Sequence, residues 1–294
     1  MIKAMVFRSL LLLAVLACRP AAAGARDLDE VKASGVLRHL GVPYAYFVTG
    51  SGDGMDVEIM RLFAAKLGVK YEFVPTEWDT CIGDLTGRQA RLKAGDAERG
   101  QETPVRGDVI ASGMTVLPWR AKVMAFSAPT FKNQVWLVAR AESKLMPIKP
   151  SRSVEKDIAA VKKMLRDKAL LCKANTCLDP TLYDLGTTGA ELRLFAGPLN
   201  AMVPALLKKE AEVTLLDAPD AFVALENWPG KIKVLGPVSA VQDMAAAFRK
   251  DSPRLREAFD AFLADLKKSG AFRAIVEKYY PYVREYDPAF LQGL

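Results

Sequence analysis

Hydrophobic and polar positions follow two different periods in the first third of the chain. The apolar run Val36–Val42 is typical of a strand, and Val69–Val74 alternates apolar and polar positions as a half-buried strand does. Between them, apolar residues recur at helical spacing over residues 55–68, and Gly68 is placed to end that helix. A strand, a helix and a second strand in this order predict a βαβ unit with parallel strands.

The same kind of pattern returns in the second half of the chain. Helical spacing over residues 155–168 precedes apolar runs at 212–217 and 231–238, which predict strands. The strongest helical pattern follows Ser252, which is placed to cap it, and ends at Gly270. A shorter helix is expected over residues 271–280. The pattern as a whole therefore predicts two α/β modules followed by terminal helices.

One segment interrupts this pattern. Residues 86–106 are polar, mixed in charge and rich in Gly, with no sustained helical or alternating period. We interpret them as an exposed insertion between the first module and the strand expected over residues 108–114.

The N-terminus has the layout of a secretory signal. Lys3 and Arg8 precede an apolar run over residues 9–17, and small residues follow to residue 25. The run is shorter than the roughly 20 residues of a membrane span, so we expect cleavage after Ala23 or Ala25 and a soluble periplasmic protein that begins near Arg26. The alternative is a lipoprotein box ending at Cys18, which would leave the protein anchored to the membrane through lipid on that residue.

Charge and motifs exclude several classes of function. The formal charge of the whole chain is +7, but three basic residues and no acidic residue lie in the first 25 positions, which leaves +4. Lys and Arg are interspersed with acids, so we expect no nucleic-acid partner. The chain has no phosphate-binding or dinucleotide-binding glycine motif and a single histidine, His39. We therefore expect neither a cofactor nor a metal.

Three cysteines remain after the signal segment. Cys172 and Cys177 lie five positions apart, and an exported chain meets an oxidising compartment, so we predict a small disulfide loop between them. Free thiols are the alternative. Cys81 is then expected to be free and buried.

Several separated blocks resemble the bacterial extracellular solute-binding proteins, family 3, which serve polar amino-acid ABC importers. The blocks occur in the order of that family from about residue 35 to residue 280. They are GVLRHLGV (35–42), GMDVEIMRLFAAKLGV (54–69), WDTCIGDL (78–85), RGDVIASGMTVLPWRAKVMAFSAPTF (106–131), LGTTG (185–189), EVTLLDAPDA (212–221) and the closing residues 248–280.

The resemblance implies a type II periplasmic-binding-protein fold. Two α/β lobes, each a mixed, mostly parallel sheet flanked by helices, are expected to be joined by a hinge of two strands. We predict that residues 26–141 and 240–294 form lobe 1 and that residues 142–239 form lobe 2. The two crossings are then expected at 139–142 and 238–244, with the ligand in the cleft between the lobes.

The same resemblance assigns roles around a ligand carboxylate. In the T-x-x-x-x-R block, Arg120 is expected to grip an α-carboxylate, with Thr115 and Gly113 beside it. A guanidinium suits this role because its planar fork matches a carboxylate and stays charged. Thr187 and Thr188 of the G-T-T turn are expected to reach the carboxylate from the second lobe. Without the resemblance, Arg120 would be interpreted as a helix cap or a surface ion pair.

Other residues are expected to hold the rest of the ligand. Asp217, at the end of an apolar strand, matches the family's acid for the ligand ammonium, and its alternative role is a helix cap. Trp78 matches a stacking aromatic, with Tyr44 or Tyr46 on the other side, although aromatic residues at such positions are also ordinary core residues. The chain departs from the family at Leu117, at Thr130, in the segment 86–106 and in the CKANTC loop.

The predicted function is therefore that of the substrate-binding component of an ABC importer, and not of an enzyme. The expected partners of this monomer are an amino acid or similar small carboxylate and a permease in the inner membrane. One alternative is a partner-binding or sensory relative that takes no small ligand. Another is a periplasmic dehydratase on the same fold, which needs a buried general acid. The sequence places Glu58, Glu77 and Glu191 on the surface or on helices.

Overall fold

A computed structural model describes residues 26–283 of the chain. The predicted signal segment 1–25 and the lipid attachment at Cys18 lie outside these residues. Among the described residues, none of the helices has the length and apolar character that a membrane crossing requires.

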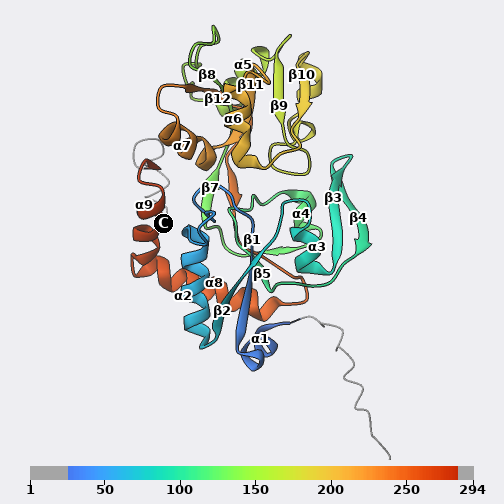
Figure 1. Cartoon of the computed structure of the whole chain (residues 1–294), viewed down its shortest axis with the longest axis vertical. Helices are drawn as coiled ribbons and strands as arrows, with labels where there is room; N and C mark the ends of the chain where they lie inside the picture. The colour runs from blue at the N-terminus through green and yellow to red at the C-terminus, as the bar shows by residue number, and fades with distance from the viewer. Residues whose placement is uncertain (1–25, 284–294) are drawn as a thin grey trace, which may run out of the picture.

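Two five-stranded sheets form the centres of two lobes, as expected for a two-lobed α/β fold (Figure 1). Each sheet contains two parallel and two antiparallel pairings. The sheet of lobe 1 has the order β2 (Lys70–Pro75), β1 (Val36–Gly41), β5 (Val109–Ile110), β14 (Ala247–Phe248), β6 (Ala125–Phe126). The sheet of lobe 2 has the order β10 (Glu191–Leu194), β9 (Ala169–Cys172), β11 (Val213–Asp217), β8 (Val135–Arg140), β12 (Ile232–Pro237).

Helices flank both sheets. Lobe 1 carries α1 (Leu28–Ser34), α2 (Met55–Leu67), α3 (Cys81–Thr86), α4 (Pro118–Ala121), α8 (Pro253–Lys268) and α9 (Ala271–Tyr279). Lobe 2 carries α5 (Val154–Lys163), α6 (Met202–Leu207), α7 (Ala218–Asn227) and the short 3₁₀ helices η1 (Pro180–Tyr183), η2 (Leu185–Thr188) and η3 (Leu199–Ala201).

The terminal helices pack back onto lobe 1 through their apolar face. On α8, Phe259 and Phe262 contact Phe63 of α2, with ring centroids 5.2 and 5.4 Å away. Fully burying one such side chain stabilises a fold by about 1.5–3 kcal/mol. The helical spacing that predicted this helix therefore marks the surface by which the end of the chain closes the first lobe.

Two short antiparallel strands connect the lobes. They are β7 (Phe131–Asn133) and β13 (Gln242–Met244), seen between the sheets in Figure 1. The first crossing therefore precedes the position predicted for it at 139–142. The reason is that β8 pairs with β11 and β12 and is a central strand of lobe 2. Lobe 2 begins between Asn133 and Val135, and the predicted lobe boundary at residue 141 is corrected accordingly.

The polar insertion is a β-hairpin with one shift of register, between Arg88 and Ala90. Strands β3 (Arg88–Lys93) and β4 (Asp96–Glu102) pair in antiparallel register and pack on α3 and α4 beside the lobe interface (Figure 1). Ala94 and Gly95 form its two-residue turn with φ of 48° and 80°, the positive values that a tight hairpin turn requires. One face of the hairpin packs Ala90, Leu92 and Ala97 against the core, but this alternation is too short and too interrupted by charged residues to have predicted the strands.

Candidate functional site

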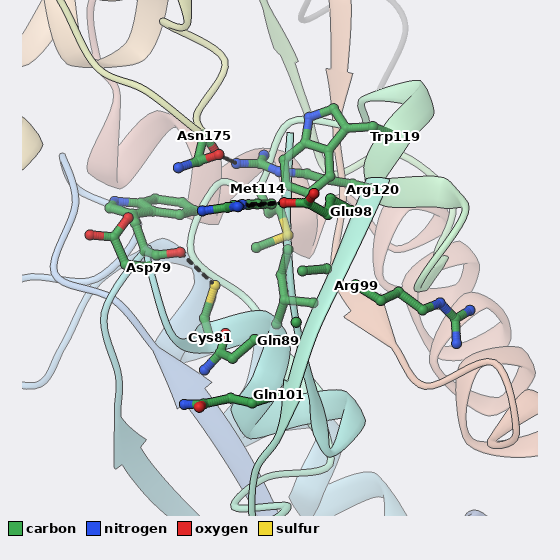
Figure 2. A pocket seen from close by; sticks show the side chains of 15 residues that line it. Asp79, Cys81, Gln89, Glu98, Arg99, Gln101, Met114, Trp119, Arg120 and Asn175 are labelled. Carbon is green, nitrogen blue, oxygen red and sulfur yellow. Dashed lines mark hydrogen bonds and ion pairs between the residues drawn. The ribbon is translucent and has the colours of Figure 1, made fainter. Parts of the chain in front are cut away.

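A cavity of about 580 Å³ lies where the hairpin, α3 and α4 of lobe 1 meet the loop after β9 of lobe 2 (Figure 2). Residues from both lobes line it: Trp78, Trp119 and Arg120 from lobe 1, and Asn175 from lobe 2. In open α/β sheets, ligands bind beyond the carboxyl ends of the strands, which is where the loop after β9 is found.

Arg120 is the buried cation of this cavity. The residue is 3% exposed, and its Nη1 donates to the Thr115 carbonyl at 3.0 Å. Its Nη2 makes a long bond of 3.4 Å to the Asn175 carbonyl, and its buried Nε has no partner. Among residues 26–283, Arg120 forms no salt bridge. The Nε–Nη2 edge of the guanidinium is therefore weakly engaged, and this edge is the one that pairs with a carboxylate side-on.

Two indole rings flank the guanidinium. Its central carbon lies 5.8 Å from the Trp78 ring centroid and 5.4 Å from that of Trp119, within the range of cation–π attraction. The Nε1 atoms of both tryptophans are buried and unpartnered. Together with Arg120, three residues that line this cavity each carry one buried N–H donor without an acceptor. Such groups are costly to bury unsatisfied, which is the arrangement expected where a ligand supplies the acceptors.

The acids of the cavity differ in their state of pairing. Glu98 of the hairpin is bound by Arg91 at 2.5 Å and by Lys93, and these bonds lower the pKa of its carboxyl group. Asp79 is exposed, and it forms no ion pair or hydrogen bond among the described residues. Among the described residues, the cavity therefore holds a buried cation without a salt bridge, Arg120, an exposed one, Arg99, and an unpaired carboxylate, Asp79.

Asn175 joins the two lobes at the cavity, and the sequence analysis did not identify it. Its Oδ1 accepts a hydrogen bond from the Leu92 amide of the hairpin at 3.1 Å, while its carbonyl meets Arg120. Its φ of 61° lies in the left-handed region, which asparagine tolerates better than most residues. The signal available in the sequence was its position just after the buried run of β9, the same reasoning that selected Asp217.

Asp217 lies at the lobe interface in a polar cluster that is fully buried. One of its oxygens accepts from the Tyr44 hydroxyl at 2.6 Å and from the Cys177 thiol at 2.9 Å. The other accepts from Asn133 Nδ2 at 2.6 Å. Burial raises the pKa of Asp217, and these hydrogen bonds oppose the rise. Tyr44 belongs to lobe 1, Asn133 to the crossing strand and Asp217 to lobe 2, so the cluster ties the three parts together.

The cysteines do not form the disulfide predicted between residues 172 and 177. Both are free and buried thiols. The thiol of Cys177 donates to Asp217, whereas that of Cys172 faces the Leu170 carbonyl at 3.5 Å within its own strand. Cys81 is also free and buried, and burial raises its pKa to about 12.

The remaining residues of the T-x-x-x-x-R block have structural partners. Thr115 is 1% exposed and bridges to Met244 of the returning strand, next to Arg120. Gly113 donates its N–H to Asp56 Oδ2 at 2.7 Å. Its φ is 60°, and a Cβ there would lie 2.3 Å from the Phe47 ring, so only glycine fits. Thr115 therefore lies beside the cavity, and the amide of Gly113 is already satisfied.

Thr187 and Thr188 are not brought to this cavity. They end η2, where their hydroxyls donate to the carbonyls of Asp184 and Leu185. The next strand begins at Glu191, which pairs with Ala169, the first residue of β9. Because the cavity lies beyond the last residue of β9, η2 is found at the opposite end of the sheet. The loop Lys173–Cys177 occupies the position that the resemblance assigned to the G-T-T turn.

The other residues selected from the sequence have structural partners or exposed positions. Tyr46 donates its hydroxyl to Glu226 of α7 at 3.0 Å, which adds a second contact between the lobes. His39 is buried between the Tyr71 hydroxyl and the Ala111 carbonyl, and burial lowers its pKa to about 4. Glu58 pairs with Lys278, and Glu191 is exposed. Within residues 26–283, no group of three or more His, Cys, Asp or Glu side chains is arranged to hold a metal ion.

Two α/β lobes, two crossing strands and a cavity at their interface define a type II periplasmic-binding-protein fold. The chain belongs to the bacterial extracellular solute-binding proteins, family 3, whose model matches residues 37–102 and 104–282.

Solved structures and curated relatives agree with this assignment. The P235GK mutant of ArgBP from T. maritima is 25% identical, with a TM-score of 0.67 over 86% of this chain and 99% of that one. The arginine-bound form of truncated ArgBP from T. maritima is also 25% identical, with a TM-score of 0.62 over 81% of this chain and 99% of that one. The amino-acid-binding protein AabA of Dichelobacter nodosus is 22% identical over 79% of this chain and 81% of its own length.

A second group of relatives consists of longer proteins. The membrane-bound lytic murein transglycosylase F of Desulfosudis oleivorans is 24% identical over 80% of this chain but only 45% of its own length. The chain thus spans about half the length of this relative and of its counterpart in Photobacterium profundum, where the share is 49%.

Proposed function

We propose that the chain is the periplasmic substrate-binding component of an ABC importer. It holds an amino acid or a similar small carboxylate in the Arg120 cavity and delivers it to a permease in the inner membrane. The observation that supports this function is the state of Arg120: a buried guanidinium with no salt bridge and an unpartnered Nε at the cavity.

The physical argument starts from the cost of that buried charge. An ionised group removed from water is stable only when it is paired and hydrogen-bonded. A ligand carboxylate on the Nε–Nη2 edge of Arg120 supplies both the opposite charge and two acceptors. Each hydrogen bond to a charged group contributes about 1.5–3 kcal/mol, so this one contact accounts for a large part of the affinity of a small ligand.

The rest of the cavity suits an amino acid. Trp78 and Trp119 offer apolar ring surface and two N–H donors. Asp79 offers a free carboxylate for the ligand ammonium, or for a cationic side chain such as that of the arginine bound by the T. maritima relative. Asp217 was predicted for the ammonium; in the present arrangement its two oxygens are bonded within the protein, so we assign the ammonium to Asp79.

The test is a thermal-shift screen followed by calorimetry. Purified protein is screened against amino acids, dicarboxylates, amines and short peptides, since a ligand at 100 times its Kd adds about 2.7 kcal/mol of stability. The Kd of the best ligand is then measured for Arg120→Gln and for Lys122→Gln. Lys122 is an exposed cation two residues away, paired with Asp96, so its variant controls for the loss of charge.

We expect Arg120→Gln to weaken binding by about 100-fold or more, which is about 2.7 kcal/mol, and Lys122→Gln to leave the Kd unchanged. Equal affinities in both variants would contradict the assignment of Arg120. Absence of any ligand in a folded protein would instead favour the partner-binding alternative. The importer role is tested separately, by uptake of the identified ligand in cells with and without this chain.

A further inference from the structure

A second cavity lies on the other side of the hairpin. It measures about 240 Å³ and is lined by the hairpin and by the segment that joins β14 to α8. All of its lining residues belong to lobe 1. Gln89, Ala90 and Arg99 line both cavities, so the hairpin separates them.

Basic side chains dominate this second cavity. Four of them line it against a single acid, Asp251, and the cavity therefore carries a formal charge of +3. The four are Arg88, Arg99, Arg249 and Lys250.

Arg249 is the buried member of the group. The residue is 9% exposed, and its Nε and Nη2 bind the two carboxylate oxygens of Asp251 at 2.9 and 3.0 Å. Its Nη1 is buried without any hydrogen-bond partner. One pair of donors is thus held in place by Asp251, while the remaining amino group has no acceptor. A buried donor of this kind costs about 1–3 kcal/mol unless an acceptor reaches it.

The other three cations are available to the same cavity. Arg88 uses its Nε to bind the Gly100 carbonyl at 3.0 Å, which leaves its two terminal amino groups. Figure 2 shows Arg99 directed away from Arg120. Among the described residues, Arg88, Arg99 and Lys250 form no salt bridge, so nothing in lobe 1 neutralises them.

We propose that this second cavity is a binding site for a phosphate group, separate from the solute cavity. Guanidinium groups match the oxygens of phosphate in a bidentate manner, and an excess of three positive charges suits an oxyanion that carries two negative charges. The volume is several times the roughly 30 Å³ that one water occupies in the liquid. Because only lobe 1 lines the cavity, phosphate binds whether or not the lobes are closed.

The experiment is a calorimetric titration of the full chain with inorganic phosphate, with ionic strength held constant by sodium chloride. Lys250→Gln and Arg99→Gln each remove one exposed cation of the cavity. Arg91→Gln is the matched control, since Arg91 is an exposed arginine of the same hairpin that lines only the solute cavity. We expect the first two variants to raise the phosphate Kd about 10-fold each, and the control to leave it unchanged.

A further variant, Arg249→Gln, removes the buried cation of the cavity. Circular dichroism confirms that it folds, and we expect it to abolish saturable phosphate binding. The same titration with glycerol 3-phosphate identifies the source of the phosphate group. A lower Kd than that of inorganic phosphate indicates a phosphate carried on a larger molecule, and a higher Kd indicates free phosphate. The proposal is overturned if phosphate shows no saturable binding beyond that of chloride, or if Arg91→Gln weakens it as much as Arg99→Gln.

Discussion

Arg120 and Asp217 lie at the same interface and are buried to a similar degree, yet the hydrogen bonding around them is opposite. In the Asp217 cluster, both carboxylate oxygens accept bonds from Tyr44, Asn133 and Cys177. In the cavity, Arg120 and two tryptophans retain N–H donors without acceptors. Burial alone therefore does not distinguish a ligand site from a structural contact; the unsatisfied groups do.

The two regions of the interface are therefore expected to contribute to different properties of the protein. The Asp217 cluster holds the lobes together by bonds among protein groups, and its contribution belongs to stability. In the proposed function the donors of the cavity residues serve a ligand, so their contribution is expected in the affinity for that ligand. Mutations in the two regions are therefore expected to separate in what they change.

The largest stability effect is expected from Asp217→Ala. Removing the carboxylate leaves three buried donors without their acceptor, at about 1–3 kcal/mol each, so we expect the free energy of unfolding to fall by about 3 kcal/mol or more. Urea denaturation measures this free energy of unfolding. Asp79→Ala, which removes an exposed and unpaired acid, is the control and is expected to change stability by less than about 0.5 kcal/mol.

The same pair of variants tests which acid meets the ligand. We expect Asp79→Ala to weaken amino-acid binding. Asp217→Ala, measured without denaturant at a temperature where it is folded, is expected to bind with nearly unchanged affinity. The reverse outcome would restore the role that the sequence resemblance gave to Asp217.

A pH effect is expected from Asp220, which lies beside the Asp217 cluster. Burial, together with the nearby Asp217 charge, raises the pKa of Asp220 from 3.8 to about 8. Between these values the folded chain holds a proton that the unfolded chain has released, so stability falls as pH rises from about 4 to 8. For one proton the slope is at most about 1.4 kcal/mol per pH unit.

Asp220→Asn removes this contribution, so its stability should decline less than that of the natural chain over the same range. Urea denaturation at about pH 5 and about pH 8 measures the difference. Asp56, whose pKa burial raises to about 7, is present in both proteins and cancels in the comparison. Parallel pH profiles of the two proteins would show that Asp220 ionises as it does in the unfolded chain.

The smallest effect is expected at Asn175, where the two regions approach each other. Asn175→Gly removes the acceptor of the Leu92 amide while keeping the positive φ at no steric cost. We expect a loss of about 1 kcal/mol, seen as roughly fivefold faster hydrogen exchange at the Leu92 amide. The Thr103 amide, bonded to Gly87 within lobe 1, serves as the internal control and should not change.

Elements that bury one periodic face were predictable from the sequence. The helix α8 and the strand β11 were expected almost at their observed bounds, because one side of the helix is apolar and the strand is mostly apolar and fully buried. The hairpin was missed because its apolar positions, Ala90, Leu92 and Ala97, are few and lie among charged residues. The first crossing was placed too late because the apolar run of β8 does not reveal which sheet it joins.

The site was predictable only in part, because it depends on which ends of strands meet. Arg120 and Trp78 were selected from the sequence and do line the cavity. Thr187 and Thr188 matched a short motif, but a motif of three letters does not report whether it precedes or follows a strand. Asn175 depends on the register of β9 against its neighbours and on the hairpin tip, two facts that exist only in three dimensions.

The hydrogen bond between the Leu92 amide and Asn175 bears on how fast the two lobes can separate. Any separation of the lobes at the cavity must break it, whereas an encounter between the open protein and its solute does not involve it. Under the proposed function, the hairpin is therefore expected to lengthen the dwell time of a bound solute and to leave the capture rate unchanged.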